Sequence, residues 1–114
     1  MMSIEQLSKP REKDLLYDQG FRRLLEGYMP WFRAHDLTEN VGIDPHHVYK
    51  YEGDLYGLLD ALGIDKRYHW VVMRLNSIYR AGEVDQELRW LLIPDRSTIE
   101  KLKQLYQKRK KNTL

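Results

Sequence analysis

The side chains that could carry chemistry in this chain are its histidines and carboxylates. The 114 residues include four histidines and no cysteine. His46 and His47 are adjacent, in a stretch whose composition predicts a β-strand. Neighbouring strand residues point to opposite faces, so this pair cannot easily share one metal ion, and no third ligand stands at a zinc-type spacing. We expect neither a bound metal nor a cofactor.

Carboxylates offer a second route to catalysis. Glycoside hydrolysis needs two carboxyl groups across a sugar, and Glu52, Asp54 and Asp60 are close in sequence. Asp54 is better explained as a helix cap, because it precedes an apolar helical stripe, and Asp60 as a solvated position on that helix. No phosphate-binding loop, dinucleotide fingerprint or Ser/His/Asp arrangement is present. We therefore predict that the chain is not an enzyme and has no small-molecule substrate.

Composition narrows the remaining classes. The length and a hydrophobic fraction of 42% suit one small domain with a thin core. No run approaches the roughly 20 apolar residues that span a bilayer, and residues 1–11 lack the apolar core of a signal peptide. We expect no membrane association. Six basic residues and no acid occur from Lys101 to Lys111, but acids interleave with bases elsewhere and the net charge is only +2, so nucleic acid is not an expected partner.

The elements that must position any site begin with a predicted helix over residues 12–28. Its apolar stripe repeats with the helical period and consists of Tyr17, Phe21, Leu24, Leu25 and Tyr28. Met29-Pro30 should end this helix, because the residue before proline is pushed out of the α region. Residues 30–45 should then form an extended arm. Trp31 and Phe32 in that arm either pack on this domain or anchor the chain in a neighbour, and both interpretations stay open.

The middle of the chain reads as strand, helix, helix, strand. His47–Tyr51 predicts a strand, and an apolar stripe over 55–62 predicts a helix that Gly63 ends. The next helix, 66–78, is apolar on more than one side and should be well buried. A second strand is predicted by the alternation of Leu88, Trp90 and Leu92, and it stops at Pro94. Trp70 and Trp90 should form the small core between this strand and the 66–78 helix. A capping-box pattern, Ser97 to Glu100, starts a final helix over 97–112.

This order resembles a LysM module. In that family the first strand ends in a Gly-Asp corner, matched by Gly53-Asp54, and the first helix ends near Gly63-Ile64. The second helix ends in Leu-Asn, matched by Leu75-Asn76, and the second strand ends in Leu91-Leu92-Ile93-Pro94. The family's Gly-Gln turn before the last strand is replaced here by Asp85-Gln86. The resemblance implies a βααβ core with helices covering two antiparallel strands.

A second resemblance covers more of the chain. The run from Tyr68 to Asn76, Tyr-His-Trp-Val-Val-Met-Arg-Leu-Asn, looks like the baseplate wedge proteins of contractile-tailed phages. Those proteins carry a helical or extended N-terminal part, a LysM-like module and a C-terminal helix. The resemblance implies a structural virion protein of the tail or baseplate, assembled in the host cytoplasm. Its partners would be other baseplate proteins, with several copies in a symmetric assembly.

Together these patterns predict an α+β fold in three parts: helix and arm over 1–45, a LysM-like module over 46–95, and a helix with a basic tail over 96–114. The primary hypothesis is a docking protein of a phage tail. Its expected interface residues are Tyr17, Phe21, Leu24, Tyr28, Trp31 and Phe32.

Two other functions stay open. The first is a peptidoglycan-binding module, whose groove for N-acetyl sugars would be lined by Gly53, Asp54, Leu55, Ser77 and Ile78. The second is a nucleic-acid adaptor that uses the basic tail, which would bind DNA in a salt-dependent way.

Overall fold

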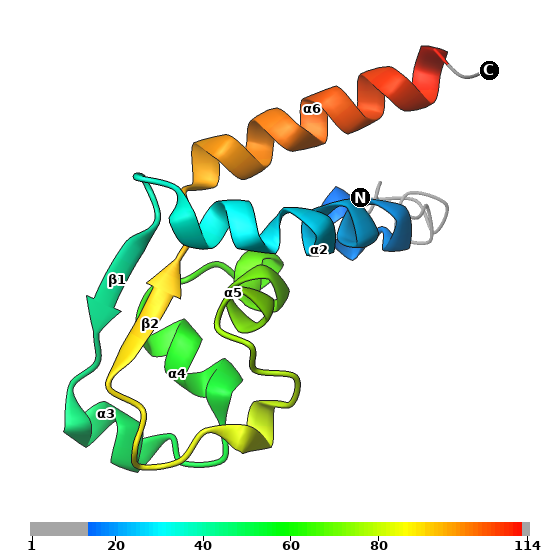
Figure 1. Cartoon of the computed structure of the whole chain (residues 1–114). Coiled ribbons are helices and arrows are strands. Elements are labelled where there is room, and N and C mark those ends of the chain that lie inside the picture. The colour runs from blue at the N-terminus through cyan, green and yellow to red at the C-terminus, as the bar shows by residue number, and fades with distance from the viewer. Residues whose placement is uncertain (1–13, 113–114) are drawn as a thin grey trace, which may run out of the picture.

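The computed structural model describes residues 14–112, with side chains to residue 110. The predicted leader, 1–11, lies outside the described residues. The chain has the expected α+β composition, with helices around a two-stranded antiparallel sheet (Figure 1). The main elements are α2 (Gln19–Ala34), β1 (Glu39–Gly42), α3 (Pro45–Lys50), α4 (Leu55–Ala61), α5 (His69–Leu75), β2 (Trp90–Ile93) and α6 (Arg96–Asn112). Short 3₁₀ turns occupy Leu15–Tyr17, Lys66–Tyr68 and Ala81–Glu83.

Helix α2 runs through Pro30, so the predicted end at Met29-Pro30 is wrong. A proline inside a helix removes a backbone hydrogen bond and costs about 3 kcal/mol. The buried face of α2 continues past it, however, to Phe32, which is 1% exposed. Burying this side chain contributes about 1.5–3 kcal/mol, and Arg33 in the same last turn adds a hydrogen bond to the Leu75 carbonyl, so the two together offset the cost. The arm expected over 30–45 is therefore the end of α2 followed by β1.

The strand predicted at His47–Tyr51 is also wrong, because these residues belong to α3 and its C-cap. Asp44 begins α3 by accepting the His46 N–H at 2.8 Å through its side chain, and Pro45 occupies the first helical position, where no N–H is needed. Val48 is the one buried side chain that α3 contributes. The local start signal at Asp44-Pro45 outweighs the strand preference of the residues after it.

The sheet pairs β1 with β2 in antiparallel register, with Gly42 opposite Trp90 and Val41 opposite Leu91. Leu91 points into the core, whereas Trp90 is 61% exposed and covers Gly42. The prediction that Trp90 lies in the core is therefore wrong. Successive strand side chains point to opposite faces, and it is the next residue, Leu91, that faces the core. Trp70 is half-buried and packs against the core.

The local signals around α4 are confirmed. Asp54 accepts the Gly57 N–H at 3.0 Å and caps the helix. Gly63 follows the helix with φ +79°, a left-handed conformation that glycine adopts without strain. The Ile64 N–H then closes the end by donating to the Leu59 carbonyl at 3.0 Å, as in a Schellman motif.

Helix α5 lies between two groups of buried side chains and contributes to both. Val71 and Leu75 belong to a cluster formed mainly with α2, and Val72 and Met73 belong to a cluster formed mainly with α4. The predicted burial of this helix is confirmed. Figure 1 shows α2 between α5 and α6, and Ile99 of α6 is buried in the same cluster as Val71.

The C-terminal end of α5 is held by two polar side chains. The Asn76 Nδ2 donates to the Leu92 carbonyl at 2.9 Å and to the Val72 carbonyl at 2.7 Å, while its Oδ1 accepts the Leu92 N–H at 2.7 Å. Arg33 of α2 donates to the Leu75 carbonyl at 3.0 Å. These bonds satisfy carbonyls that a helix end leaves without partners and connect α5 to β2 and α2.

A cluster of charged groups holds α6 against the start of the described chain. The Lys103 side chain is buried, with its Nζ 2.7 Å from Asp14 Oδ1 and 3.0 Å from Glu100 Oε1. Arg67 lies 3.1 Å from Asp14 Oδ2, and the Tyr68 hydroxyl donates to Glu100. The cluster thus joins residues that lie far apart in sequence.

The start of α6 differs from the predicted capping box. Asp95 caps the helix through its side chain, which accepts the Thr98 N–H at 3.2 Å. The Ser97 hydroxyl donates to the same carboxylate. Glu100, expected to reach back to the helix start, is used in the charged cluster instead.

The charges in this cluster shift its titrations. Burial disfavours the ionised Asp14 and Glu100, but hydrogen bonds from Lys103 and other donors outweigh burial and lower the pKa of both carboxyls. Burial also disfavours the Lys103 ammonium, but the two carboxylates outweigh it and raise the pKa of Lys103. Lowered carboxyl pKa values stabilise the fold above about pH 4, and this stability is lost as the pH falls. The raised Lys103 pKa stabilises below about pH 10.4 and is lost as the pH rises above it.

Asp14→Asn should therefore lower the free energy of unfolding by about 2 kcal/mol near neutral pH, because Lys103 and Arg67 lose a charged partner. The difference from the unmutated chain should shrink as the pH falls below about 4, where Asp14 becomes protonated in both states. Urea unfolding followed by circular dichroism measures this. Asp36→Asn, at an exposed position, is the matched control and should cost little throughout. A loss that does not change with pH would contradict the charge argument.

The two glycines Gly63 and Gly27 should respond to alanine with opposite signs. Neither position has a neighbour within 4 Å of an added Cβ, so backbone conformation alone decides. Gly63→Ala should lower the free energy of unfolding by about 1 kcal/mol, because its φ is left-handed. Gly27→Ala, on the exposed face of α2, should raise it by about 0.5–1 kcal/mol. Urea unfolding of both variants tests this, and an equal effect at both sites would contradict it.

Candidate functional site

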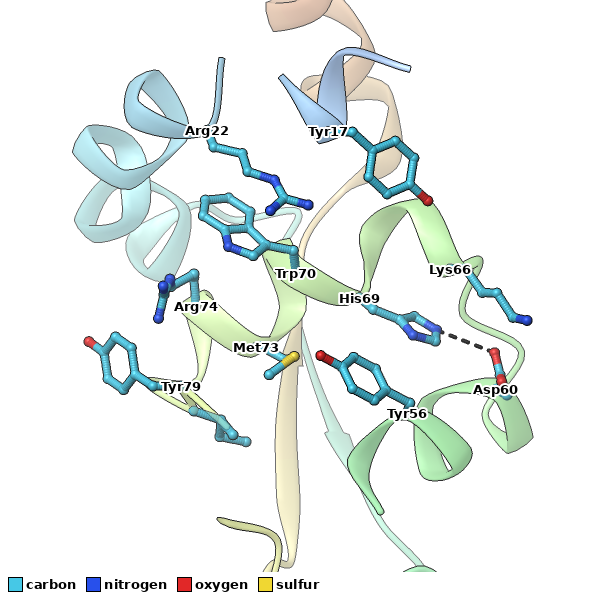
Figure 2. Close-up of a pocket in the computed structure, with 11 residues that line it drawn as sticks. Tyr17, Arg22, Tyr56, Asp60, Lys66, His69, Trp70, Met73, Arg74 and Tyr79 are labelled. Carbon is cyan, nitrogen blue, oxygen red and sulfur yellow. Dashed lines mark ion pairs between the residues drawn. The ribbon is translucent and has the colours of Figure 1, made fainter. Parts of the chain in front are cut away.

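A groove of about 490 Å³ opens beside α5 and is the candidate functional site. We call it the aromatic–arginine groove. Figure 2 shows side chains from the N-terminal part, from α4 and from α5 converging on it. Its lining residues are Tyr17, Arg22, Tyr56, Asp60, Lys66, His69, Trp70, Met73, Arg74, Ile78 and Tyr79.

Two arginines and three aromatic rings alternate along the groove. The Arg22 guanidinium carbon lies 5.8 Å from the centre of the Tyr17 ring and 4.9 Å from that of Trp70. The Arg74 guanidinium carbon lies 5.6 Å from the Trp70 ring centre and 4.5 Å from that of Tyr79. All four contacts are within cation–π range. The order Tyr17, Arg22, Trp70, Arg74, Tyr79 forms a continuous ladder.

The ladder is held in place from both ends. Arg22 Nε donates to the Leu16 carbonyl at 2.6 Å, which fixes the guanidinium over Trp70. Arg74 follows Trp70 by four residues, so both lie on one face of α5. Arg74 Nε lies 2.8 Å from Glu26 Oε1, close enough for an ion pair, although it makes no hydrogen bond of good geometry. Opposite charge and helical spacing together orient Arg74.

His69 and Asp60 form the other wall of the groove. The His69 ring is 5% exposed and stacks on Tyr56 at 6.0 Å between ring centres. Its Nε2 lies 2.9 Å from the Ile64 carbonyl and 3.4 Å from Asp60 Oδ1 (Figure 2). A carbonyl oxygen only accepts, so this contact requires a proton on Nε2. That nitrogen is a donor here and cannot act as a general base.

Tyrosine, tryptophan and arginine make up most of the lining of the groove. The lining residues include no serine, threonine or cysteine that could act as a nucleophile. Within residues 14–112 no group of three or more metal-ligating side chains is close enough to hold an ion. In the same part of the chain, no helix has the length and apolar character to cross a membrane.

The six predicted interface residues fall in different places. Phe21 and Phe32 have almost no accessible surface, so their prediction as partner anchors is wrong, because they fill this chain's own core. Tyr17 lines the aromatic–arginine groove. Leu24 and Tyr28 line a second groove, and Trp31 is 45% exposed beside Tyr28. For these four, the interface role stays a prediction.

Four of the five residues predicted to line a glycan groove have roles in the fold itself. Leu55 is fully buried, and the Asp54 side chain is used as the cap of α4. Gly53 turns the chain with φ +74° and donates its N–H to the Val84 carbonyl. Ser77 also has a positive φ, 57°, and its hydroxyl accepts a bond from Arg33. Of the five, only Ile78 lines the aromatic–arginine groove.

Sequence reasoning did not identify Arg22, Tyr56, Arg74 or Tyr79 as site residues. The spacing of Trp70 and Arg74 at i and i+4 is a local signal for one contact of the ladder. No sequence signal brings Arg22 of α2 to Trp70, because that contact exists only when α2 packs against α5.

No family model, curated protein or solved structure matches this chain.

Arg22→Met should lower the free energy of unfolding by about 1–2 kcal/mol, because the Leu16 carbonyl loses its charged donor and Trp70 loses a cation–π contact. It should also move the Trp70 indole N–H signal in a ¹H–¹⁵N spectrum. Arg80→Met, at an exposed arginine outside the groove, should change neither. An unchanged Trp70 signal in the Arg22 variant would show that the ladder does not form in solution.

Proposed function

We propose that this chain is a non-enzymatic assembly protein that binds a partner protein through the aromatic–arginine groove. The observation that carries the proposal is the composition of the groove. Tryptophan, tyrosine and arginine are the residues that dominate binding energy at protein interfaces, and they supply six of its eleven lining residues. Three of them are open to a partner, with Tyr17, Tyr56 and Tyr79 between 48% and 63% exposed.

Pre-organisation supports the same function. Two arginines held between aromatic rings lose little side-chain freedom on binding, which lowers the entropic cost of association. Their planar donors can also pair with a carboxylate of the partner. The expected partner segment therefore inserts apolar side chains between the tyrosines and places an acidic group near Arg22 or Arg74.

The wider role follows from the resemblance to phage baseplate wedge proteins. We propose that the chain is a structural component of a phage tail or baseplate, built into the virion during assembly in the host cytoplasm. Its neighbours would be other baseplate proteins in a symmetric assembly. Exposed aromatic side chains mark surfaces that bind other proteins. Their presence here supports a protein whose surface is covered by neighbouring subunits in the assembled particle.

Antibodies raised against the purified chain should label one end of tailed particles in electron micrographs of virions from its source. In a complementation assay, Tyr79→Asp should abolish incorporation of the protein into particles, because it places a charge in the groove. Tyr49→Asp alters an even more exposed tyrosine, 72% against 63%, outside the groove, and should be incorporated normally. Particles that lack the protein, or equal incorporation of both variants, would contradict the proposal.

The peptidoglycan alternative is separated from this function by a pulldown on purified cell walls. We expect no retention of the chain, because Leu55 is buried, Asp54 caps α4 and the Ser77 hydroxyl is bonded to Arg33. Retention that survives Tyr79→Asp would favour the glycan-binding function instead.

A further inference from the structure

A second groove, of about 670 Å³, runs between α2 and α6. Its two walls are helical stripes. Gly20, Leu24 and Tyr28 on α2 are spaced by four residues, and Leu102, Leu105, Tyr106 and Arg109 on α6 follow the i, i+3, i+4, i+7 pattern. Figure 1 shows α6 extending above α2. One face of α2 and one face of α6 thus border the same groove.

The two helices are fixed at a definite separation. The Tyr106 hydroxyl donates to Asp18 Oδ2 at 3.0 Å, and its ring lies 5.5 Å from that of Phe21. Gly20 permits this approach, because a Cβ there would collide with the Tyr106 hydroxyl. The charged cluster around Lys103 holds the first half of α6. The groove is therefore built into the fold.

The floor of this groove is apolar and accessible. Leu105 is 59% exposed and Tyr28 is 38% exposed, while Leu24 and Leu102 are half-buried. An apolar stripe on a helix normally packs against another element. In α6 only the first half of this stripe is covered, where Ile99 and Lys103 are buried, and the stripe continues uncovered to Leu105.

The charged side chains that line the groove are all basic. Its four charged lining residues are Arg23, Lys108, Arg109 and Lys110. Arg109 and Lys110 also interact with other groups of the chain, so Arg23 and Lys108 are the principal rim cations for a ligand. The nearest acid in a described contact, Asp18, lies at one end and is bonded to Tyr106. A ligand in this groove therefore meets leucines below and cations at the edges.

We propose that the groove docks an amphipathic helix of a partner protein whose polar face is acidic. Apolar side chains of that helix would cover Leu24, Leu102 and Leu105, and its carboxylates would face the cationic rim. A second copy of α6 is disfavoured because its own polar face is basic. Nucleic acid could meet the rim but would leave the leucine floor uncovered. The walls span residues 20–28 and 102–110, about 13 Å of helix, so the partner would contribute two to three turns.

The test is selection from a displayed library of helical peptides against the full chain. Enriched peptides should combine leucine-like residues at i, i+3, i+4 and i+7 with acidic residues between them. Their dissociation constants should rise about 30-fold with Leu105→Glu, the effect of an interface hot spot. Leu37→Glu is the matched control, because Leu37 is also 59% exposed, and it should leave affinity unchanged. Circular dichroism checks that both variants fold.

Rim charge is tested separately with Arg23→Glu, which should weaken the same peptides, and Arg80→Glu, which should not. No enrichment, enrichment of basic peptides, or equal binding to the Leu105 and Leu37 variants would overturn the proposal. Binding that appears only after residues 1–13 are deleted would assign the groove to the chain's own N-terminal segment. Binding of a duplex DNA probe that Leu105→Glu abolishes would assign it to nucleic acid. Each result is independent of Tyr79 and of the aromatic–arginine groove.

Discussion

The Asn76 side chain makes the interaction on which the rest of this structure depends. A two-stranded sheet is marginal in water on its own, and β1 contributes little buried surface to it. The Asn76 carboxamide bonds to both backbone groups of Leu92. These are the two hydrogen bonds that a residue of a neighbouring strand would make with Leu92. The same carboxamide bonds to the Val72 carbonyl. The end of α5 and the middle of β2 are thereby held at one separation.

The Asn76 bonds between α5 and β2 also determine where the aromatic–arginine groove lies. Arg33 of α2 bonds to the Leu75 carbonyl at the same end of α5. Side chains of α5 belong to both core clusters. With α2, α5 and β2 fixed together, the remaining face of α5 presents His69, Trp70 and Arg74 to the aromatic–arginine groove. That face has Arg22 on one side and Tyr56 on the other. A fold of modest size can hold arginines between rings because the backbone beneath them is fixed at several points.

Local signals in the sequence predicted the elements where they acted alone. Asp54 and Gly63 correctly bounded α4, and the apolar character of residues 69–75 correctly indicated a buried helix. Prediction failed where two signals competed. Pro30 suggested a helix end, yet the burial of Phe32 and the bond from Arg33 to the Leu75 carbonyl offset its cost. Strand-forming residues after His46 suggested a strand, yet the Asp44-Pro45 start makes a helix. The Glu39–Gly42 strand has no strong preference of its own and forms because β2 pairs with it.

The candidate site shows the same division. Aromatic residues of the N-terminal segment were expected to bind partners, and packing divided them, with Phe21 and Phe32 inside the core and Tyr17, Tyr28 and Trp31 outside. An amphipathic stripe does not specify which of its edges stays accessible, because that depends on the elements that cover it. The ladder depends even more on packing, since Arg22 meets Trp70 only across the α2–α5 contact.

The sequence by itself therefore determined where α4 begins and ends, that a buried helix lies within residues 66–78, and that the chain is α+β. Caps and left-handed turns depend on backbone groups within about four residues, so a single sequence contains the information. The tertiary structure alone decided the strand partner of β2, the role of Asn76 and the residues of both grooves. Those features depend on burial and on charges brought together from segments that lie far apart in the chain, and such contacts have no local pattern.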